Sequence, residues 1–342
     1  MDLRAYRPED APGVVALLRT AFGDWPGRRV AAHGRPEEFW RWKHERNPHG
    51  ASYVLLAERD GRLAAMRSYM PWPLRVGPRR LAAVHTVDIA TDPAFRGEGV
   101  SSQLSREAIE HLREQNSFAL GLPNDMSRSQ SRRIGWEPVA PIAIWLKVRR
   151  PLRVTHRARS LRAPGRSLAV PSVEAPTAVD CLGDSAALTG LLTQCRPDGS
   201  HFATDAGPDY LRWRYESLLG DYRAVTEYDG GALTGLAIFT LRQRGELWEG
   251  SVCELFVRPG DHRTARRLLK QIAGSAPLDY LAAVAPGGSE LQRTLTRSGF
   301  IRSPLGRRAL GVTLYQDGIA PDPRRRDSWS LSFGDLERLQ LC

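Results

Sequence analysis

The strongest constraint on the fold is an internal repeat. Residues 38–45 read EFWRWKHE and residues 209–216 read DYLRWRYE, so that acid, aromatic, Arg, Trp, base, aromatic and Glu recur at a constant offset. An Asp-Gly pair, the usual turn of a β-hairpin, follows in each half at Asp60 and Asp229. The pattern predicts a tandem duplication of one unit that contains both helices and strands.

The chain is long enough for two such units, since 342 residues exceed the usual size of a single domain. A segment rich in arginine, with Pro151 and Pro164, separates the halves and is typical of a solvated linker. We expect domains at residues 1–148 and 173–320, a basic linker at residues 149–172 and a C-terminal tail at residues 321–342.

The first half contains a strand, a glycine turn and an amphipathic helix in direct succession, within residues 84–115. Residues 85–91 have the β-branched content of a strand, and Pro93 ends it. Apolar residues from Val100 to Leu112 are spaced three and four apart, which indicates a helix. The turn between them carries glycines at the start of that helix, where unpaired N–H groups and the helix dipole favour an anion.

The order strand, Arg96-x-x-Gly99-x-Ser101, helix resembles the coenzyme A motif of the GNAT superfamily of acyl-CoA N-acyltransferases. Ser101 replaces the small Gly or Ala of that motif. The resemblance implies an α+β fold with α/β/α layers, in which each of two GNAT-like domains has a mixed, mostly antiparallel central sheet flanked by helices. It also implies an acyl-CoA site, with acetyl-CoA as the expected donor. Its expected residues are Ile89, Ala90, Thr91, Arg96, Gly97, Glu98, Gly99, Val100, Ser101 and Asn124.

Downstream, Asn124, Gly135 and Trp136 match the spacing of the fourth helix of GNAT enzymes. The family's usual proton donor to the leaving thiolate is a tyrosine, and Ser131 stands in its place. A thiol has a pKa near 8.5, so its thiolate leaves without a dedicated acid, or a water or Ser131 serves.

The resemblance also suggests the groups that act on the acyl carbonyl and the amine. A backbone N–H near residues 89–91 would polarise the carbonyl. Asp88 stands where GNAT enzymes often place an acid that takes the amine proton, directly or through water, and His85 is the second candidate base. Strand alternation places these two side chains on opposite faces, so they are not expected to act as a pair.

The second half has lost the glycine turn. Residues 257–266 keep Gly260 alone, and the positions equivalent to Asn124 and Ser131 hold Gly288 and Leu295. We therefore expect a degenerate domain that does not bind coenzyme A.

Residues 23–50 are rich in aromatic rings, including Trp25, Phe39, Trp40 and Trp42. In GNAT enzymes this region covers the acceptor pocket, but rings at helical spacing also fill cores. Trp40, Trp42 and Glu45 suit a small amine such as an amino sugar without selecting one.

The composition bounds the remaining options. The formal charge is +11, and nearly all basic residues are arginines. This charge fits a solvated basic linker, attraction of coenzyme A or docking of an acidic acyl carrier protein. No nucleic-acid-binding motif occurs in the sequence. Four scattered cysteines without a Cys-x-x-Cys pair, no apolar run of membrane-spanning length and no signal peptide predict a cytoplasmic protein without a metal.

The sequence therefore predicts an N-acyltransferase that moves an acyl group, expected to be acetyl, from coenzyme A to the primary amine of a small molecule by direct attack in a ternary complex. Two alternatives stay open. One is a catalytically silent protein that senses coenzyme A or an acyl-CoA, which the serine at position 131 favours. The other is an acyltransferase that takes a longer acyl group from a carrier protein.

Overall fold

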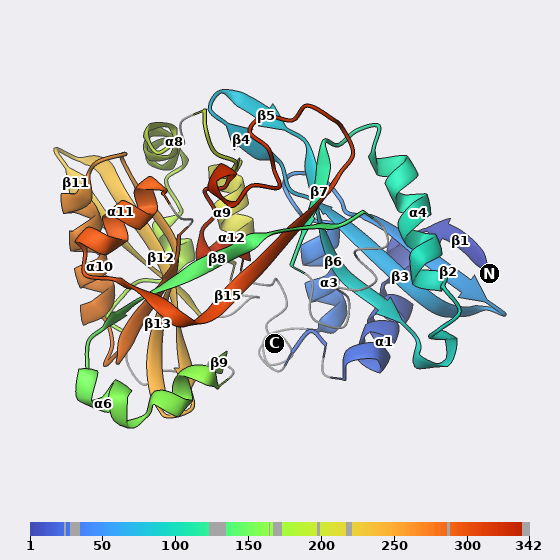
Figure 1. The fold of residues 1–342 in the computed structure, drawn as a ribbon, viewed down its shortest axis with the longest axis horizontal. Coiled ribbons are helices and arrows are strands. Elements are labelled where there is room, and N and C mark those ends of the chain that lie inside the picture. The colour runs from blue at the N-terminus through green and yellow to red at the C-terminus, as the bar shows by residue number, and fades with distance from the viewer. Residues whose placement is uncertain are drawn as a thin grey trace. The chain divides into compact units, whose positions relative to one another are not determined.

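The fold comes from a computed structural model of the whole chain. The structure describes all residues except 24, 28–34, 123–134, 164, 167–172, 197–198, 217–220, 286–287 and 337–342. The chain divides into two compact units (Figure 1). Unit 1 comprises residues 1–140 and 309–328 together with the C-terminal residues, and unit 2 comprises residues 141–308 and 329–337.

Unit 1 is built on one sheet. Its strands are β1 (Asp2–Ala5), β2 (Tyr53–Arg59), β3 (Arg62–Pro71), β6 (Ala83–Thr91) and β7 (Phe118–Gly121), in this order, and the end of β15 (Ile301–Leu314) lies next to β7. The pairs are antiparallel except for β6 with β7. A short hairpin, β4 (Leu74–Val76) and β5 (Arg79–Leu81), precedes β6. The predicted hairpin at Asp60 is confirmed.

Helices flank the sheet of unit 1. After the short 3-10 helix η1 (Pro8–Asp10), helix α1 (Ala11–Phe22) packs against β3, β6 and α3 (Pro36–His44). Helix α4 (Val100–Leu112) places Val100 and Leu104 on Leu55, Ala57 and Ala65 of the sheet. The 3-10 helix η2 (Pro93–Phe95) joins β6 to the turn before α4.

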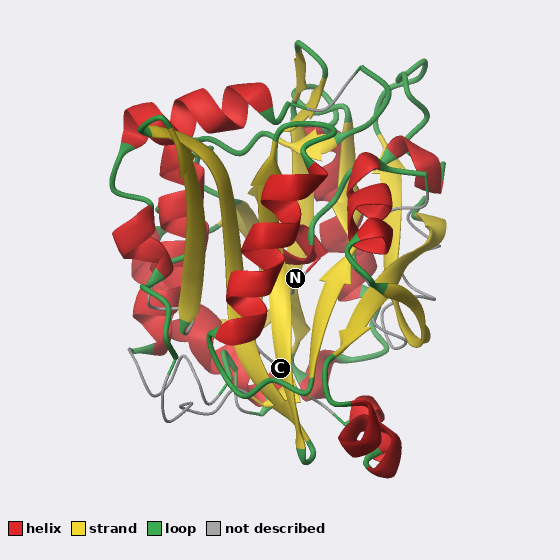
Figure 2. Ribbon diagram, turned by 90° about the vertical axis from the view of Figure 1, so that its left-hand side faces the viewer, coloured by secondary structure: helices red, strands yellow, loops and turns green. Residues whose placement is uncertain are grey.

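Unit 2 repeats this order of elements. Strands β11 (Tyr222–Asp229), β12 (Ala232–Arg244) and β13 (Leu247–Val257) are antiparallel neighbours, helix α10 (His262–Gly274) follows, and β14 (Tyr280–Val284) returns parallel to β13. The core lies between α10 and the sheet and includes Phe239, Leu268 and Leu281. Helix α10 packs against β11, β12 and β13, and Figure 2 distinguishes the helices, strands and loops of the chain by colour.

The remaining elements of unit 2 are shorter. They are α6 (Pro151–His156), η3 (Ala158–Arg162), β9 (Gly165–Arg166), α7 (Ala178–Cys181), α8 (Ser185–Gln194), β10 (Ala203–Thr204), α9 (Pro208–Arg214), α11 (Glu290–Arg297) and α12 (Phe333–Leu336), with η5 (Arg326–Ser328) just before its last segment. Ser289 caps α11 by accepting a hydrogen bond from the N–H of Gln292.

The last strand of each repeat pairs with the other repeat. Strand β8 (Glu137–Val148), expected to close the first domain, pairs antiparallel with β14 at residues 144–148, whereas β15 contributes residues 311–314 to β7. The choice of partner is non-local, so local sequence does not reveal it. The units consequently have boundaries that differ from those expected at residues 148, 172 and 320.

The expected linker and part of the expected tail, residues 329–337, belong to unit 2. Strand β9 pairs with β12, and Arg153 contacts buried Asp279 at 3.1 Å. In the C-terminal segment, Trp329, Leu331 and Phe333 are buried. The described residues of these segments therefore pack into the fold, although their high arginine and proline content is typical of a solvated linker.

Candidate active site

The turn between β6 and α4 has the geometry of an open helix N-terminus. Gly97 and Gly99 have φ values of 85° and 79°, in the left-handed region that glycine adopts without strain. Gly99 is the N-cap of α4 and supplies no capping side chain. Its carbonyl accepts the first helical bonds, from the N–H groups of Ser102 and Gln103. Among the residues that the structure describes, no acceptor binds the preceding N–H groups of the first turn, which leaves them for an external acceptor.

The surface around this turn is accessible to an anion. A Cβ at Gly97 or Gly99 would meet no atom within 4 Å, and Arg96 is exposed between the strand and the glycines. Glu98 adds a negative charge at the same place, but Arg59 holds its carboxylate at 2.6 Å. That pairing reduces the repulsion of an incoming phosphate. Val100 is buried beneath the turn, so it offers its backbone rather than its side chain.

Next to the turn, β6 runs past its neighbour. The ladder between β6 and β7 joins residues 83–86 to residues 118–121, and β6 continues to Thr91 beyond it. On the other edge of β6, Met66 lies opposite Ala90, and the N–H of Asp92 donates to Ala64. Because N–H groups alternate between the two edges of a strand, the N–H of Thr91 lies on the edge that β7 has left.

Asp88 lies in a bulge of β6. Ser68 pairs with Val87 but Met66 pairs with Ala90, so one residue of β3 faces two of β6. Asp88 has a φ of 44°, unusual for a residue with a side chain. The expected alternation therefore does not apply across this point. The charge of Lys43 acts on both Asp88 and His85, which the sequence had assigned to opposite faces.

The carboxylate of Asp88 is buried and fully engaged. It forms an ion pair with Lys43, accepts a hydrogen bond from Trp25 Nε1 at 3.1 Å and lies 3.0 Å from His44 Nε2. Burial alone would raise the pKa of Asp88, but the charge of Lys43 and the hydrogen bond from His44 hold it well below its usual range. Burial lowers the pKa of His44 to about 4, so His44 is neutral at pH 7.

His85 is buried as well. Its ring meets Trp72 edge-on, with centroids 5.5 Å apart. Nδ1 of His85 has no hydrogen-bond partner among the described residues. Burial, and then the charge of Lys43, lower the pKa of His85 to about 3. The structure thus places both predicted bases in the interior of unit 1, one carboxylate held by a cation and one neutral imidazole.

The aromatic segment before β2 contributes mainly to the core. Phe39, Trp40 and Trp42 are buried, and Phe39 stacks on Trp42 with centroids 5.5 Å apart. Trp40 donates from Nε1 to the hydroxyl of Tyr6, which donates in turn to Glu45. Of the two readings of these rings, the structure favours packing.

Lys43 was missed as a site residue, although the repeat contained a signal for it. In unit 2 the equivalent pair on α9 and the residue after it is Arg214 and Tyr215, and Tyr215 donates to Glu254 of β13 at 2.5 Å. In both halves, a basic residue is followed by a ring that contacts a carboxylate on a later strand. Glu254 is buried, and burial followed by the charge of Asp335 raises its pKa to about 8.

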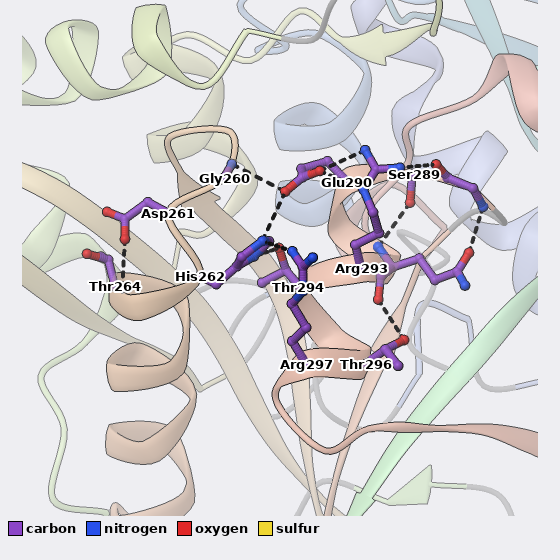
Figure 3. A network of polar contacts seen from close by, with 12 residues as sticks. Gly260, Asp261, His262, Thr264, Ser289, Glu290, Arg293, Thr294, Thr296 and Arg297 are labelled. Atoms are coloured by element: carbon purple, nitrogen blue, oxygen red, sulfur yellow. Dashed lines mark hydrogen bonds and ion pairs between the residues drawn. The ribbon is translucent and has the colours of Figure 1, made fainter.

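The turn of unit 2 differs from that of unit 1 because carboxylates occupy it. Asp261 caps α10 by accepting the N–H of Thr264 at 3.0 Å, and Glu290 accepts the N–H of Gly260 at 3.2 Å (Figure 3). His262 contacts Thr294 at 3.1 Å in the same network. The N–H groups of Gly260 and Thr264, which an anion could use at this helix, are therefore already bound.

Two predicted residues, Asn124 and Ser131, lie outside the described residues. Gly135, from the same motif, has a φ of 81°, and Trp136 is buried. Within the described parts of the chain, no His, Cys, Asp and Glu side chains gather as three or more possible metal ligands, and no helix has the length and apolar character to cross a membrane.

Residues 2–139 match the family model of the acetyltransferase (GNAT) domain. The first part of the chain is therefore similar to a GNAT domain. This match supports the predicted GNAT resemblance over residues 2–139, and the sheet with its flanking helices confirms the predicted α+β fold. A search of curated proteins found no match to the sequence.

Solved structures share the fold over 92% of the chain. A GCN5-related N-acetyltransferase from Anabaena variabilis is 13% identical, with a TM-score of 0.64 and 73% of its own chain covered. One from Kribbella flavida is 16% identical, with a TM-score of 0.61 and 71% covered. Eis1 from Mycobacterium abscessus is 14% identical, with a TM-score of 0.59 and 74% covered. At these identities the likeness shows a shared fold alone.

Proposed function

We propose that the protein is an N-acyltransferase that transfers an acyl group, acetyl in the first instance, from coenzyme A to the primary amine of a small molecule. The observation that carries the proposal is the uncapped N-terminus of α4 behind Gly97 and Gly99, within a segment that matches the GNAT domain. Coenzyme A carries a pyrophosphate, which such a turn binds through backbone N–H groups.

The acyl end of the donor would lie along the free edge of β6. The pyrophosphate turn begins directly after this strand, so a thioester that extends from it reaches the edge that β7 leaves after Thr86. The N–H of Thr91 is the proposed donor to the acyl oxygen. An N–H at this point stabilises the negative charge that grows on the oxygen as the amine attacks.

The amine is proposed to react from its own neutral fraction. Asp88 is held by Lys43 and His44, and the pKa of His85 is lowered to about 3 by burial, so neither group is matched to proton abstraction near pH 7. We assign Asp88 to positioning: it anchors the bulge from which Ile89, Ala90 and Thr91 run to the turn. The kcat/KM should then rise with pH along the ionisation of the chosen amine.

Unit 2 is proposed to be a degenerate GNAT-like domain that does not bind coenzyme A. The carboxylates of Asp261 and Glu290 already accept N–H groups at its turn and would repel a phosphate. Residues 311–314 of β15, which pair with β7, belong to unit 1.

The test combines binding and turnover. Isothermal titration should detect one coenzyme A site, and an amine panel should release free thiol from acetyl-CoA. Gly99→Trp should abolish binding. Gly23→Trp is the matched control, because Gly23 has a φ of 83° and equally open surroundings at the end of α1. Unchanged affinity in Gly99→Trp would overturn the site.

A second candidate, a silent sensor of coenzyme A or an acyl-CoA, is favoured by the engagement of Asp88 and the low pKa of His85. Binding without thiol release from any amine would support it. Release only from an acylated carrier protein would support the third reading, in which an acidic carrier delivers a longer acyl group.

A further inference from the structure

A basic groove lies on unit 2, away from the turn of unit 1 in sequence. It has a volume of about 500 Å³ and runs along α10, beside the end of β8 and the residue after α11. The side chains that line it include Lys147, Arg263, Arg266, Arg267, Lys270 and Ser298. We call it the α10 groove.

The positive charge of the α10 groove is only partly neutralised. Arg267 is bound to Glu227 at 2.7 Å. Among the described residues, no ion pair with a carboxylate involves Lys147, Arg263, Arg266 or Lys270. The spacing of three and four along α10 places these arginines and Lys270 on one side of the helix.

The pKa of Lys147 reflects the positive charges around it. Burial, followed by the charges of Arg266 and Arg149, lowers the pKa of Lys147 below its ordinary value. An anion in the α10 groove would relieve this repulsion. A cationic ligand would increase it.

Ser298 supplies an independent observation. It is 6% exposed, and its hydroxyl has no hydrogen-bond partner among the described residues. Its backbone N–H is already used by Thr294 and Leu295 of α11. A buried hydroxyl without a partner is costly, so a ligand oxygen at this end of the groove would restore the missing bond.

We propose that the α10 groove binds a small molecule that carries a phosphate or pyrophosphate group. Arginine forks and a serine hydroxyl suit phosphate oxygens, and a concave groove of this volume suits a small molecule better than the surface of a folded protein. The proposal does not depend on the function of unit 1, because every residue of the groove belongs to unit 2.

Inorganic pyrophosphate is the probe. Isothermal titration of the full chain, in the native sequence and in Gly99→Trp, separates the α10 groove from the turn at Gly97 and Gly99. A pyrophosphate site should remain in Gly99→Trp. In that background Arg266→Gln should weaken it at least tenfold and Ser298→Ala, which is nearly isosteric, about threefold.

Arg159→Gln is the matched control, since Arg159 is an exposed arginine of unit 2 outside the groove. It should leave the affinity unchanged. Equal weakening in Arg159→Gln and Arg266→Gln, or binding of a long polyanion such as heparin without binding of pyrophosphate, would overturn the proposal. Loss of coenzyme A turnover with intact pyrophosphate binding would count against the proposed function alone.

Discussion

At the scale of single residues, a substitution of Asp88 could lower activity either by destabilising the fold or by removing a catalytic base. Asp88→Asn keeps a side chain that tolerates the positive φ but removes the charge that holds buried Lys43. We expect the free energy of unfolding to fall by about 3–5 kcal/mol, measured by urea denaturation. Lys43→Met combined with Asp88→Asn should recover much of the loss. A fully stable Asp88→Asn without activity would instead identify Asp88 as the base.

A second prediction for a single residue concerns Glu254 and the dependence of stability on pH. Burial, then the charge of Asp335, raises its pKa from 4.5 to about 8. The folded protein therefore keeps a proton between these values that the unfolded chain has lost, so stability falls as pH rises through this window, by up to about 5 kcal/mol. Denaturation at pH 5 and pH 8 should show a smaller decline in Glu254→Gln than in the control Glu246→Gln. Equal declines would assign the pH dependence to other groups.

At the scale of elements, α4 and α10 show how one motif loses a function. Both follow a strand and a glycine turn, but only α10 has a side-chain cap. Asp261→Ala removes that cap and should lower the free energy of unfolding by about 1 kcal/mol in thermal or urea denaturation. Asp209→Ala, in the first turn of α9, should change it less because Asp209 forms only an exposed pair with Arg212. Coenzyme A binding gained through Asp261→Ala alone would contradict the proposed role of Glu290.

The same elements show what sequence can predict. Periodicity located β6, α4 and the hairpins because each depends on neighbours in the chain. The bulge at Asp88 and its pairing with Lys43 depend on contacts across more than forty residues, which alternation does not describe. Even so, the recurrence of Lys43-His44 as Arg214-Tyr215 was visible in the repeat. A strand carboxylate could have been sought for both pairs.

At the scale of the whole molecule, the partners of β8 and β15 make the two repeats interdependent. In a fragment of residues 1–148, β7 would lack its neighbour β15 and β8 would lack its neighbour β14. The side chains of β7 are buried in the full chain, so this fragment would expose an apolar strand edge. An exposed, apolar strand edge promotes aggregation. We expect this fragment to be insoluble or without cooperative unfolding by circular dichroism.

Coexpression of that fragment with residues 149–342 should restore soluble protein and coenzyme A binding, because each fragment then supplies the strand that the other lacks. The intact full chain serves as the control for solubility and coenzyme A binding. A fragment of residues 1–148 that unfolds cooperatively and binds coenzyme A by itself would show that the strand pairing is dispensable. In that case the duplication would be two independent domains in one chain, as its sequence first suggested.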